Sequence, residues 1–310
     1  MKLLTYCIPT YNRKQKALLS CERIIKQIEK FNLQDYVDVL LSDNCSPDLT
    51  CDFLHKNLTS FPAYLKIVRQ ETNLGLVGNV NFLFNNSNSE YVWIVGDDDL
   101  IEDGAIKHLL QEIENSRRSF YLLNFKCEVN GVVGEDYFIK KDLPEDLYKD
   151  GTTGGFGLIS NEVFNKIDFE KLFQLDTSGD EILMYPMART FYGLFVLNGS
   201  ILYDKIFLLH HAGDYSWMNK YNEVQSIYSW MAIHNLLKPL VHKEKFKSLL
   251  KLHTDTQIFR VSSFFYIVKS RDIKFIHKLF IHNLLFKVCI AGVRSVINAK
   301  YNKAIERNKK

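Results

Sequence analysis

The sequence predicts an α/β fold in which helices cover both faces of a mainly parallel sheet, followed by a helical C-terminal region. Over roughly the first 130 residues, short apolar runs alternate with stretches of helical spacing, as in right-handed β-α-β crossovers. Beyond that point the alternation stops, and residues 236–305 have mainly helical spacing. With 310 residues, 46% of them hydrophobic and only 6 Pro, the chain is long enough for one large domain and an appendage.

The alternating part is expected to contain five strands and four helices. The strands are buried apolar runs, expected at Lys2–Ile8, Val37–Ser42, Leu65–Val68, Tyr91–Val95 and Ser119–Cys127. The helices have apolar residues three and four positions apart and are expected at Lys14–Phe31, Asp48–Leu58, Leu76–Asn86 and Glu102–Glu114. Residues 1–235 are therefore expected to form one domain, with halves 1–130 and 131–235, and residues 236–310 a basic helical region.

The second half of that domain is less regular. A polar loop is expected at Asp136–Gly151 and a glycine-rich turn at Thr152–Gly157. Two helices and one strand should follow, at Phe164–Leu175, Glu181–Leu197 and Leu202–Leu209. The six cysteines form no C-x-x-C pair, which favours reduced thiols and a cytoplasmic protein. The N-terminus does not resemble a signal peptide, and no run is long enough to span a membrane.

Polar or glycine-bearing segments follow each of the first four expected strands. They are Pro9–Arg13, Asp43–Ser46, Asn73–Asn79 and Asp97–Asp99. Each alone is ordinary turn chemistry. Because ligands bind outside the carboxyl ends of parallel strands, the four segments together predict one pocket.

Three consecutive carboxylates, Asp97, Asp98 and Asp99, follow the apolar run Tyr91–Gly96. Like charges this close repel unless a cation or a proton relieves them, and carboxylates are preferred ligands of Mg²⁺ and Mn²⁺. The alternative is a solvent-exposed acidic turn that binds no metal. The sequence alone leaves open which two of the three bind a metal.

The ordered motifs resemble those of family-2 glycosyltransferases with the GT-A fold, a Rossmann-like nucleotide-diphospho-sugar transferase fold. The motifs are Ile8–Arg13, Ser42–Ser46, Asn73–Gly75 with Gly78-Asn79, and Trp93–Asp99. The resemblance implies a nucleotide-sugar donor, most simply a UDP-sugar, with Mn²⁺ or Mg²⁺. CDP- and dTDP-linked donors remain open.

The resemblance also implies residue roles. Pro9, Thr10, Tyr11 and Arg13 would line the nucleotide cleft, and Asp43 would accept a hydrogen bond from the base. The nucleoside, ribose and phosphates would be contacted by Asn73, Gly75, Gly78 and Asn79. Asp97 would contact ribose or metal, Asp99 would bind the metal, and Asp98 would be the spacer.

Acceptor and catalytic residues are expected further along the chain. Gly155 and Phe156 resemble the acceptor-side loop of the family, and Asp180 falls where the family carries its base, with Glu181 as the second choice. An inverting transfer needs such a carboxylate to take the proton of the attacking hydroxyl. The alternative for this pair is N-capping of the helix that follows.

Two adjacent histidines, His210 and His211, follow the strand expected at Leu202–Leu209, and either could complete a metal shell. Trp217 could stack on a sugar of the acceptor. This segment is similar to the abequosyltransferase-like branch, which builds bacterial surface polysaccharides. The alternative for the histidines is a structural role.

The C-terminal region is strongly basic. Lys238–Lys310 contains 17 Lys and Arg against four acidic residues, which leaves 22 basic against 32 acidic in the remainder. Apolar residues alternate with Lys274, Lys278, Lys287 and Arg294, as in helices at an anionic membrane surface. The alternatives are packing on the catalytic domain and a homodimer contact. No nucleic-acid-binding module is recognised.

The sequence therefore predicts an inverting, metal-dependent glycosyltransferase on the inner face of the plasma membrane. Its acceptor would be a lipid-linked glycan of a bacterial surface polysaccharide, such as an O-antigen or capsule. The alternatives are a catalytically silent binder of nucleotide sugars or glycans, a sugar-nucleotide pyrophosphorylase and a metal-dependent phosphohydrolase. The pyrophosphorylase would need a glycine-rich basic loop where Pro9–Asn12 stands.

Overall fold

The computed structural model describes residues 1–123, 125–129, 132–133, 157–160, 200–202, 207–212, 242–244 and 289. The chain divides into two compact units, Met1–Tyr215 and Ser216–Lys310. All strands and helices named below belong to the first unit. The domain boundary expected after residue 235 lies outside the described residues and stays a prediction.

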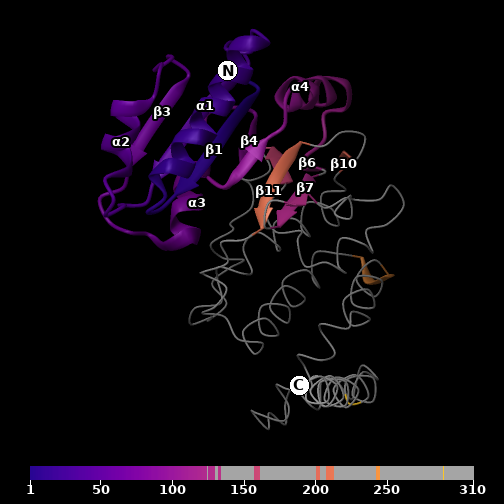
Figure 1. Ribbon diagram of the computed structural model, residues 1–310. Coiled ribbons are helices and arrows are strands. Elements are labelled where there is room, and N and C mark those ends of the chain that lie inside the picture. Colours follow the sequence, from indigo (N-terminus) through magenta and orange to yellow (C-terminus); the bar gives the residue numbers. More distant parts are fainter. Residues whose placement is uncertain are drawn as a thin grey trace, which may run out of the picture. The chain divides into compact units, whose positions relative to one another are not determined.

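A seven-stranded sheet forms the centre of the first unit (Figure 1). Four of its strands are parallel neighbours in the order β3-β2-β1-β4. They are β1 (Leu4–Thr10), β2 (Val37–Asp43), β3 (Leu65–Arg69) and β4 (Tyr91–Ile94). Each lies within two residues of its predicted bounds, because each is a short apolar run.

The sheet continues beyond β4 with a change of direction. Strand β9 (Gly157–Ser160) pairs antiparallel with both β4 and β6 (Phe120–Leu123), and β10 (Ser200–Leu202) pairs parallel with β6. The α/β fold class with a mostly parallel sheet is therefore confirmed. The expected turn at Thr152–Gly157 is wrong at its last residue, because Gly157 begins β9.

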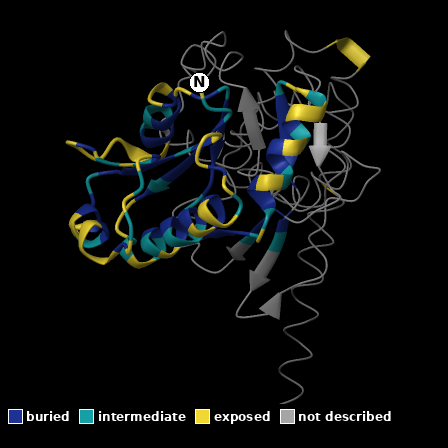
Figure 2. Cartoon of the chain, turned by 90° about the horizontal axis from the view of Figure 1, so that it is seen from above, coloured by how far each residue is buried: buried dark blue, intermediate teal, exposed yellow. Residues whose placement is uncertain are grey.

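Four helices connect the strands of the first half. They are α1 (Lys14–Lys30), α2 (Thr50–Asn57), α3 (Gly75–Asn85) and α4 (Ala105–Ser116). In α1 the residues at helical spacing Ala17, Cys21, Ile24 and Ile28 are fully buried. Figure 2 shows that helices of the chain have one buried and one exposed face.

A second, smaller sheet has the order β5-β11-β7-β8. Its strands are β5 (Asp99–Ile101), β11 (Leu208–Ala212), β7 (Phe125–Val129) and β8 (Val132–Val133). Two predicted strands are wrong here. The run Ser119–Cys127 supplies β6 to the first sheet and β7 to the second, and the run Leu202–Leu209 ends one strand and begins another. A continuous apolar run does not indicate where the chain leaves one sheet and enters the other.

The core lies between the large sheet and its helices. Leu4, Tyr6 and Ile8 of β1 are fully buried, and the Tyr6 ring packs edge-on against Trp93 of β4 at 5.4 Å between centroids. Cys7, Cys21 and Cys51 are buried free thiols, as expected for packing residues. This packing fixes the carboxyl ends of the strands, where the candidate site lies.

Candidate functional site

The loops after β1, β2, β3 and β4 meet at one edge of the large sheet. The Thr10 hydroxyl at the end of β1 donates to Asp97 Oδ2 after β4, at 2.6 Å. The Asn44 amide after β2 donates to the Thr10 carbonyl at 3.0 Å, and the Gln70 amide after β3 donates to the Asp43 carbonyl at 2.8 Å. The structure thus brings together the four segments that the sequence predicted to converge.

Asp97 is the innermost of the three consecutive aspartates. Its side chain is only 4% exposed, and its second oxygen accepts a hydrogen bond from the Arg13 guanidinium at 3.1 Å. Burial raises the pKa of Asp97 to about 6, while the contacts with Thr10 and Arg13 oppose the rise. Asp97 is therefore tied to β1 and to the start of α1.

Asp98 forms ion pairs with two basic side chains. Its Oδ2 lies 2.8 Å from Arg13 Nη1 and 3.8 Å from Lys16 Nζ. Arg13 therefore bridges Asp97 and Asp98 and offsets part of their repulsion.

Asp98 and Asp99 converge over Gly96. A Cβ atom at Gly96 would lie 2.9 Å from Asp98 Oδ1 and 3.0 Å from Asp99 Oδ2. Oxygens of both carboxylates thus lie close to Gly96, and a side chain there would make the two carboxylates shift. Oxygen ligands of this kind suit Mg²⁺ or Mn²⁺, so this part of the site fits a divalent cation.

Asp99 begins β5, a strand that the sequence did not predict. The antiparallel pairing of β5 with β11 places His210 opposite Asp99, whereas His211 is paired with Glu128 of β7. His210 is therefore the histidine in register with the aspartate expected to bind the metal. Within the described side chains, no three His, Cys, Asp or Glu groups are arranged to hold a metal ion.

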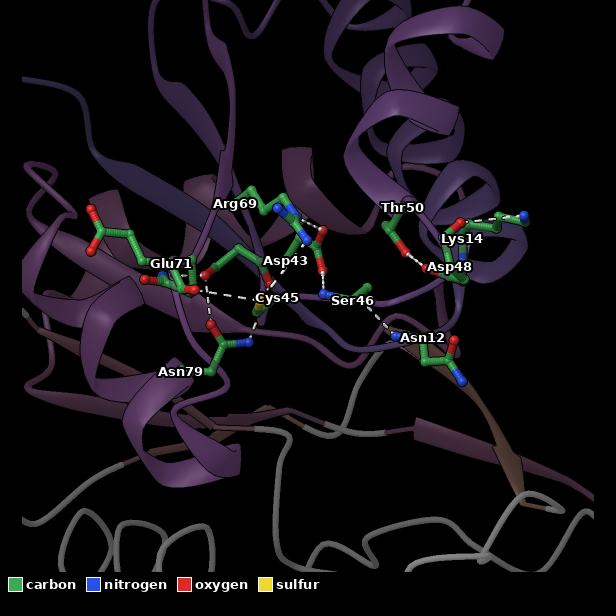
Figure 3. Close-up of polar contacts among 12 residues, drawn as sticks. Asn12, Lys14, Asp43, Cys45, Ser46, Asp48, Thr50, Arg69, Glu71 and Asn79 are labelled. Carbon is green, nitrogen blue, oxygen red and sulfur yellow. Dashed lines mark hydrogen bonds and ion pairs between the residues drawn. The ribbon is translucent and has the colours of Figure 1, made fainter.

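Asp43 at the end of β2 is fully buried, and only one of its two carboxylate oxygens accepts a hydrogen bond from a described residue (Figure 3). Its Oδ1 accepts the Ser46 amide at 3.0 Å, whereas its Oδ2 has no hydrogen-bond partner among the described residues. The nearest cation is the Arg69 guanidinium, with Nε at 3.9 Å. Burial, reinforced by Asp43, raises the pKa of the neighbouring Cys51 to about 12, so this thiol stays protonated.

A buried carboxylate oxygen without a hydrogen bond is costly, and a ligand with an N–H group would supply the missing donor. The N–H of a nucleobase imide is such a donor. The geometry of Asp43 is therefore compatible with the base contact that the sequence predicted.

The segment Asn73–Asn79 divides into an exposed and a buried part. Asn73 is exposed, and Gly75 has a left-handed φ of 71° with open space where a Cβ would stand. A Cβ at Gly78, in contrast, would lie 2.7 Å from Leu74 Cβ, so only glycine fits there.

Asn79 is 2% exposed. Its Oδ1 accepts a hydrogen bond from the Ser42 hydroxyl, and its Nδ2 donates one to the Ser42 carbonyl (Figure 3). Gln70 donates to the same hydroxyl at 2.8 Å. This buried network attaches α3 to β2 through both Oδ1 and Nδ2 of the Asn79 side chain.

The remaining predicted residues are distributed as follows. Pro9 lies within β1 in register with Ser42, and the Tyr11 side chain beyond β1 is 45% exposed. Outside the described residues lie Gly155, Phe156, Asp180, Glu181 and Trp217. Sequence reasoning missed Lys16, Asn44 and Gly96, although Asn44 and Gly96 lie inside the quoted motifs and Lys16 is three residues beyond Arg13.

The family model described as glycosyl transferase family 2 matches residues 5–167 of the chain. Among curated proteins, the chain is 34% identical over 128 residues to abequosyltransferase RfbV of Salmonella typhimurium. That alignment covers 40% of this chain and 36% of the relative, so the chain spans about a third of that relative's length.

Solved structures share the fold at low identity. S. aureus TarS 1-349 in complex with UDP is 19% identical with a TM-score of 0.55, over 90% of this chain and 75% of that one. Mannosyltransferase PcManGT from Pyrobaculum calidifontis, in complex with GDP-Man and Mn²⁺, is 11% identical with a TM-score of 0.57, over 94% of this chain and 86% of that one. The likeness confirms the GT-A fold that the motifs predicted.

Proposed function

Because the chain belongs to glycosyl transferase family 2, we propose that it transfers a sugar from a nucleotide-sugar donor to a hydroxyl group of a glycan acceptor. The observation that carries the proposal is the meeting of two features at one sheet edge. These are the buried Oδ2 of Asp43, which accepts no hydrogen bond from a described residue, and the carboxylate oxygens of Asp98 and Asp99 that lie close to Gly96. The first suits a base, and the second suits a cation beside a diphosphate.

The donor is a UDP-sugar in this proposal. A carboxylate acceptor beside a guanidinium complements the imide of uracil, which offers an N–H between two carbonyl oxygens. Cytosine has a ring acceptor at the same place and would face the Asp43 oxygen with a lone pair. UDP bound to TarS, a protein of the same fold, supports a uridine nucleotide. Tyr11, exposed at the end of β1, lines the cleft with Thr10.

Mn²⁺ or Mg²⁺ would be held by Asp98 and Asp99, with His210, His211 and Asp97 as the other candidate ligands. A cation bound there would neutralise charge on the departing nucleoside diphosphate. Arg13 contacts Asp97 and Asp98, and Lys16 contacts Asp98, so these two cations orient the aspartates. Mn²⁺ in the PcManGT complex supports the choice of cation.

The transfer is a single in-line displacement with inversion. Asp180, or Glu181 in its place, takes the proton of the acceptor hydroxyl as that oxygen forms a bond to C1 of the donor sugar. The bond between C1 and the β-phosphate oxygen breaks, and the nucleoside diphosphate leaves with its electron pair. Gly155, Phe156 and Trp217 contact the acceptor.

The acceptor is a lipid-linked intermediate of a bacterial surface polysaccharide, and the relation to an abequosyltransferase supports this class. The basic C-terminal region then brings the enzyme to an anionic membrane surface from the cytoplasmic side. No described helix is both long and apolar enough to cross a bilayer.

A donor-hydrolysis assay tests the proposal without knowledge of the acceptor. Full-length protein is incubated with UDP-sugars and Mn²⁺, and free UDP is measured. We expect slow release of UDP that EDTA stops and that Asp98→Asn and Asp99→Asn each lower at least tenfold. Release of UMP with sugar 1-phosphate would instead indicate phosphohydrolase chemistry. No release from any UDP-, GDP-, CDP- or dTDP-sugar would favour a silent binder.

A further inference from the structure

Asn44 is a buried side chain that no predicted role accounts for. It is 4% exposed and follows the last residue of β2. Its amide makes three hydrogen bonds, all to the loop before α3. Oδ1 accepts the Leu74 amide at 2.8 Å, and Nδ2 donates to Asn73 Oδ1 at 2.9 Å and to the Gly75 carbonyl at 3.1 Å.

These bonds determine how Asn73 is oriented. Its Oδ1 accepts from Asn44 Nδ2 and also from the Gly75 amide at 2.9 Å. Two donors on one atom require that atom to be the oxygen, so the amide of Asn73 cannot be reversed without losing both bonds. Its Nδ2 amino group makes no hydrogen bond to any described residue, and the residue is exposed.

The support behind Asn44 is rigid. Its own backbone amide donates to the Thr10 carbonyl of β1, so the side chain is anchored to two strands of the sheet. The loop it holds contains the left-handed Gly75, and α3 begins there. Asn44 therefore connects the edge of the sheet to the exposed segment 73–75.

We propose that Asn44 is a positioning residue for the donor: it holds Asn73 with the carbonyl oxygen turned into the loop and the amino group presented to the nucleotide. The inference rests on the proposed function, because it needs a nucleotide at this edge of the sheet. Asn44 itself does not touch the donor. Its effect on binding passes through Asn73.

A double-mutant cycle tests the coupling. The dissociation constant of the full-length protein is measured by titration calorimetry with Mn²⁺ and the best binder among UDP, CDP, dTDP, GDP and ADP. We expect Asn44→Ala and Asn73→Ala each to raise it about tenfold, the loss of one ordered hydrogen bond. The double variant should also lose about tenfold and not a hundredfold, because both changes remove one contact.

The matched control is Asn86→Ala at the opposite end of α3. The Asn86 amide also bonds a backbone carbonyl, that of Phe82 at 2.9 Å, but far from the loop in sequence. Its dissociation constant should equal that of the wild type. Additive losses from Asn44→Ala and Asn73→Ala would overturn the proposal, because independent effects would mean that Asn44 acts on the fold alone.

Asn73→Asp separates binding from stability. This variant keeps an oxygen that accepts from Asn44 Nδ2 and from the Gly75 amide, and it replaces only the exposed amino group with a carboxylate oxygen. We expect near wild-type thermal stability together with at least a tenfold loss of affinity. Wild-type affinity in this variant would overturn the inference alone. Absence of nucleotide binding by the wild type would overturn the proposed function, and this inference with it.

Discussion

Three identical residues in a row have three different environments in this chain. Asp97 is buried against Thr10 and Arg13, Asp98 shares one oxygen with Arg13 and Lys16, and Asp99 begins β5. The differences come from side chains on β1 and α1, which lie more than 80 residues away in sequence. The sequence could therefore predict an acidic cluster after β4, but not which member turns inward.

Gly96→Ala should weaken the cation site specifically. The added methyl group would lie about 3 Å from oxygens of both Asp98 and Asp99, closer than van der Waals contact allows, so the two carboxylates must shift from their present positions. We expect the Mn²⁺-dependent part of nucleotide affinity to fall at least tenfold, with a loss of about 1–3 kcal/mol in the free energy of unfolding. Calorimetric titrations with Mn²⁺ and with EDTA check this. Equal losses in both titrations would contradict it.

Asp97 should make the metal-free protein less stable as pH rises from about 4 to about 6. Its pKa is about 6 in the folded protein, above the ordinary value of 3.8, so the folded state binds more protons across that interval. Stability from this group is present below the lower value and is lost as the carboxyl ionises in the fold, by at most about 3 kcal/mol.

Urea unfolding in EDTA at pH 4 to 7, on the wild type and Asp97→Asn, isolates this contribution. The difference in free energy between the two proteins should change across the interval in the direction just given. A constant difference would contradict the raised pKa of Asp97.

At the scale of elements, local periodicity was informative and long-range pairing was not. The helix α1 begins at the predicted Lys14, and β1 to β4 lie near their predicted bounds, because spacing within one segment determines these elements. The strands β5 and β9 were missed because they are short and are stabilised by partners distant in sequence. The convergence of the four loops was predictable from parallel topology, since all carboxyl ends share one edge.

The buried network of Ser42, Gln70 and Asn79 should contribute mainly to the attachment of α3. Asn79→Ala removes the buried acceptor of the Ser42 hydroxyl and the side-chain donor to the Ser42 carbonyl, which costs about 1–3 kcal/mol in the free energy of unfolding. Chemical denaturation checks the loss, and nucleotide titration of the folded variant should show less than a threefold change. A tenfold loss of affinity with unchanged stability would instead support the ligand contact that the sequence predicted for Asn79.

At the scale of the whole molecule, charge is segregated between the two ends of the chain. The segment Lys238–Lys310 contains 17 basic and only four acidic residues, whereas acidic residues outnumber basic ones in the rest of the chain. The described residues include the proposed donor site, while the predicted base and acceptor residues lie outside them. The proposed nucleotide site belongs to the first unit, and the proposed membrane contact belongs to the C-terminal region.

Membrane binding should depend on the cations that alternate with apolar residues. We expect full-length protein to float with vesicles containing anionic phospholipid, and the quadruple change of Lys274, Lys278, Lys287 and Arg294 to Ser to lower the bound fraction at least tenfold. The matched control changes Lys300, Lys303, Lys309 and Lys310 to Ser, which removes the same charge from the chain terminus. No flotation of the wild type, or equal losses in both variants, would contradict the proposed contact.

The most direct test of the central claim is a thermal shift of the full-length protein with UDP, CDP, dTDP, GDP and ADP, each with Mn²⁺ or EDTA. The account predicts the largest stabilisation with UDP and Mn²⁺, loss of most of it in EDTA, and loss of the preference for UDP in Asp43→Asn. Stabilisation by CDP above UDP would contradict the base contact proposed for Asp43. No shift with any nucleotide would contradict the donor site itself.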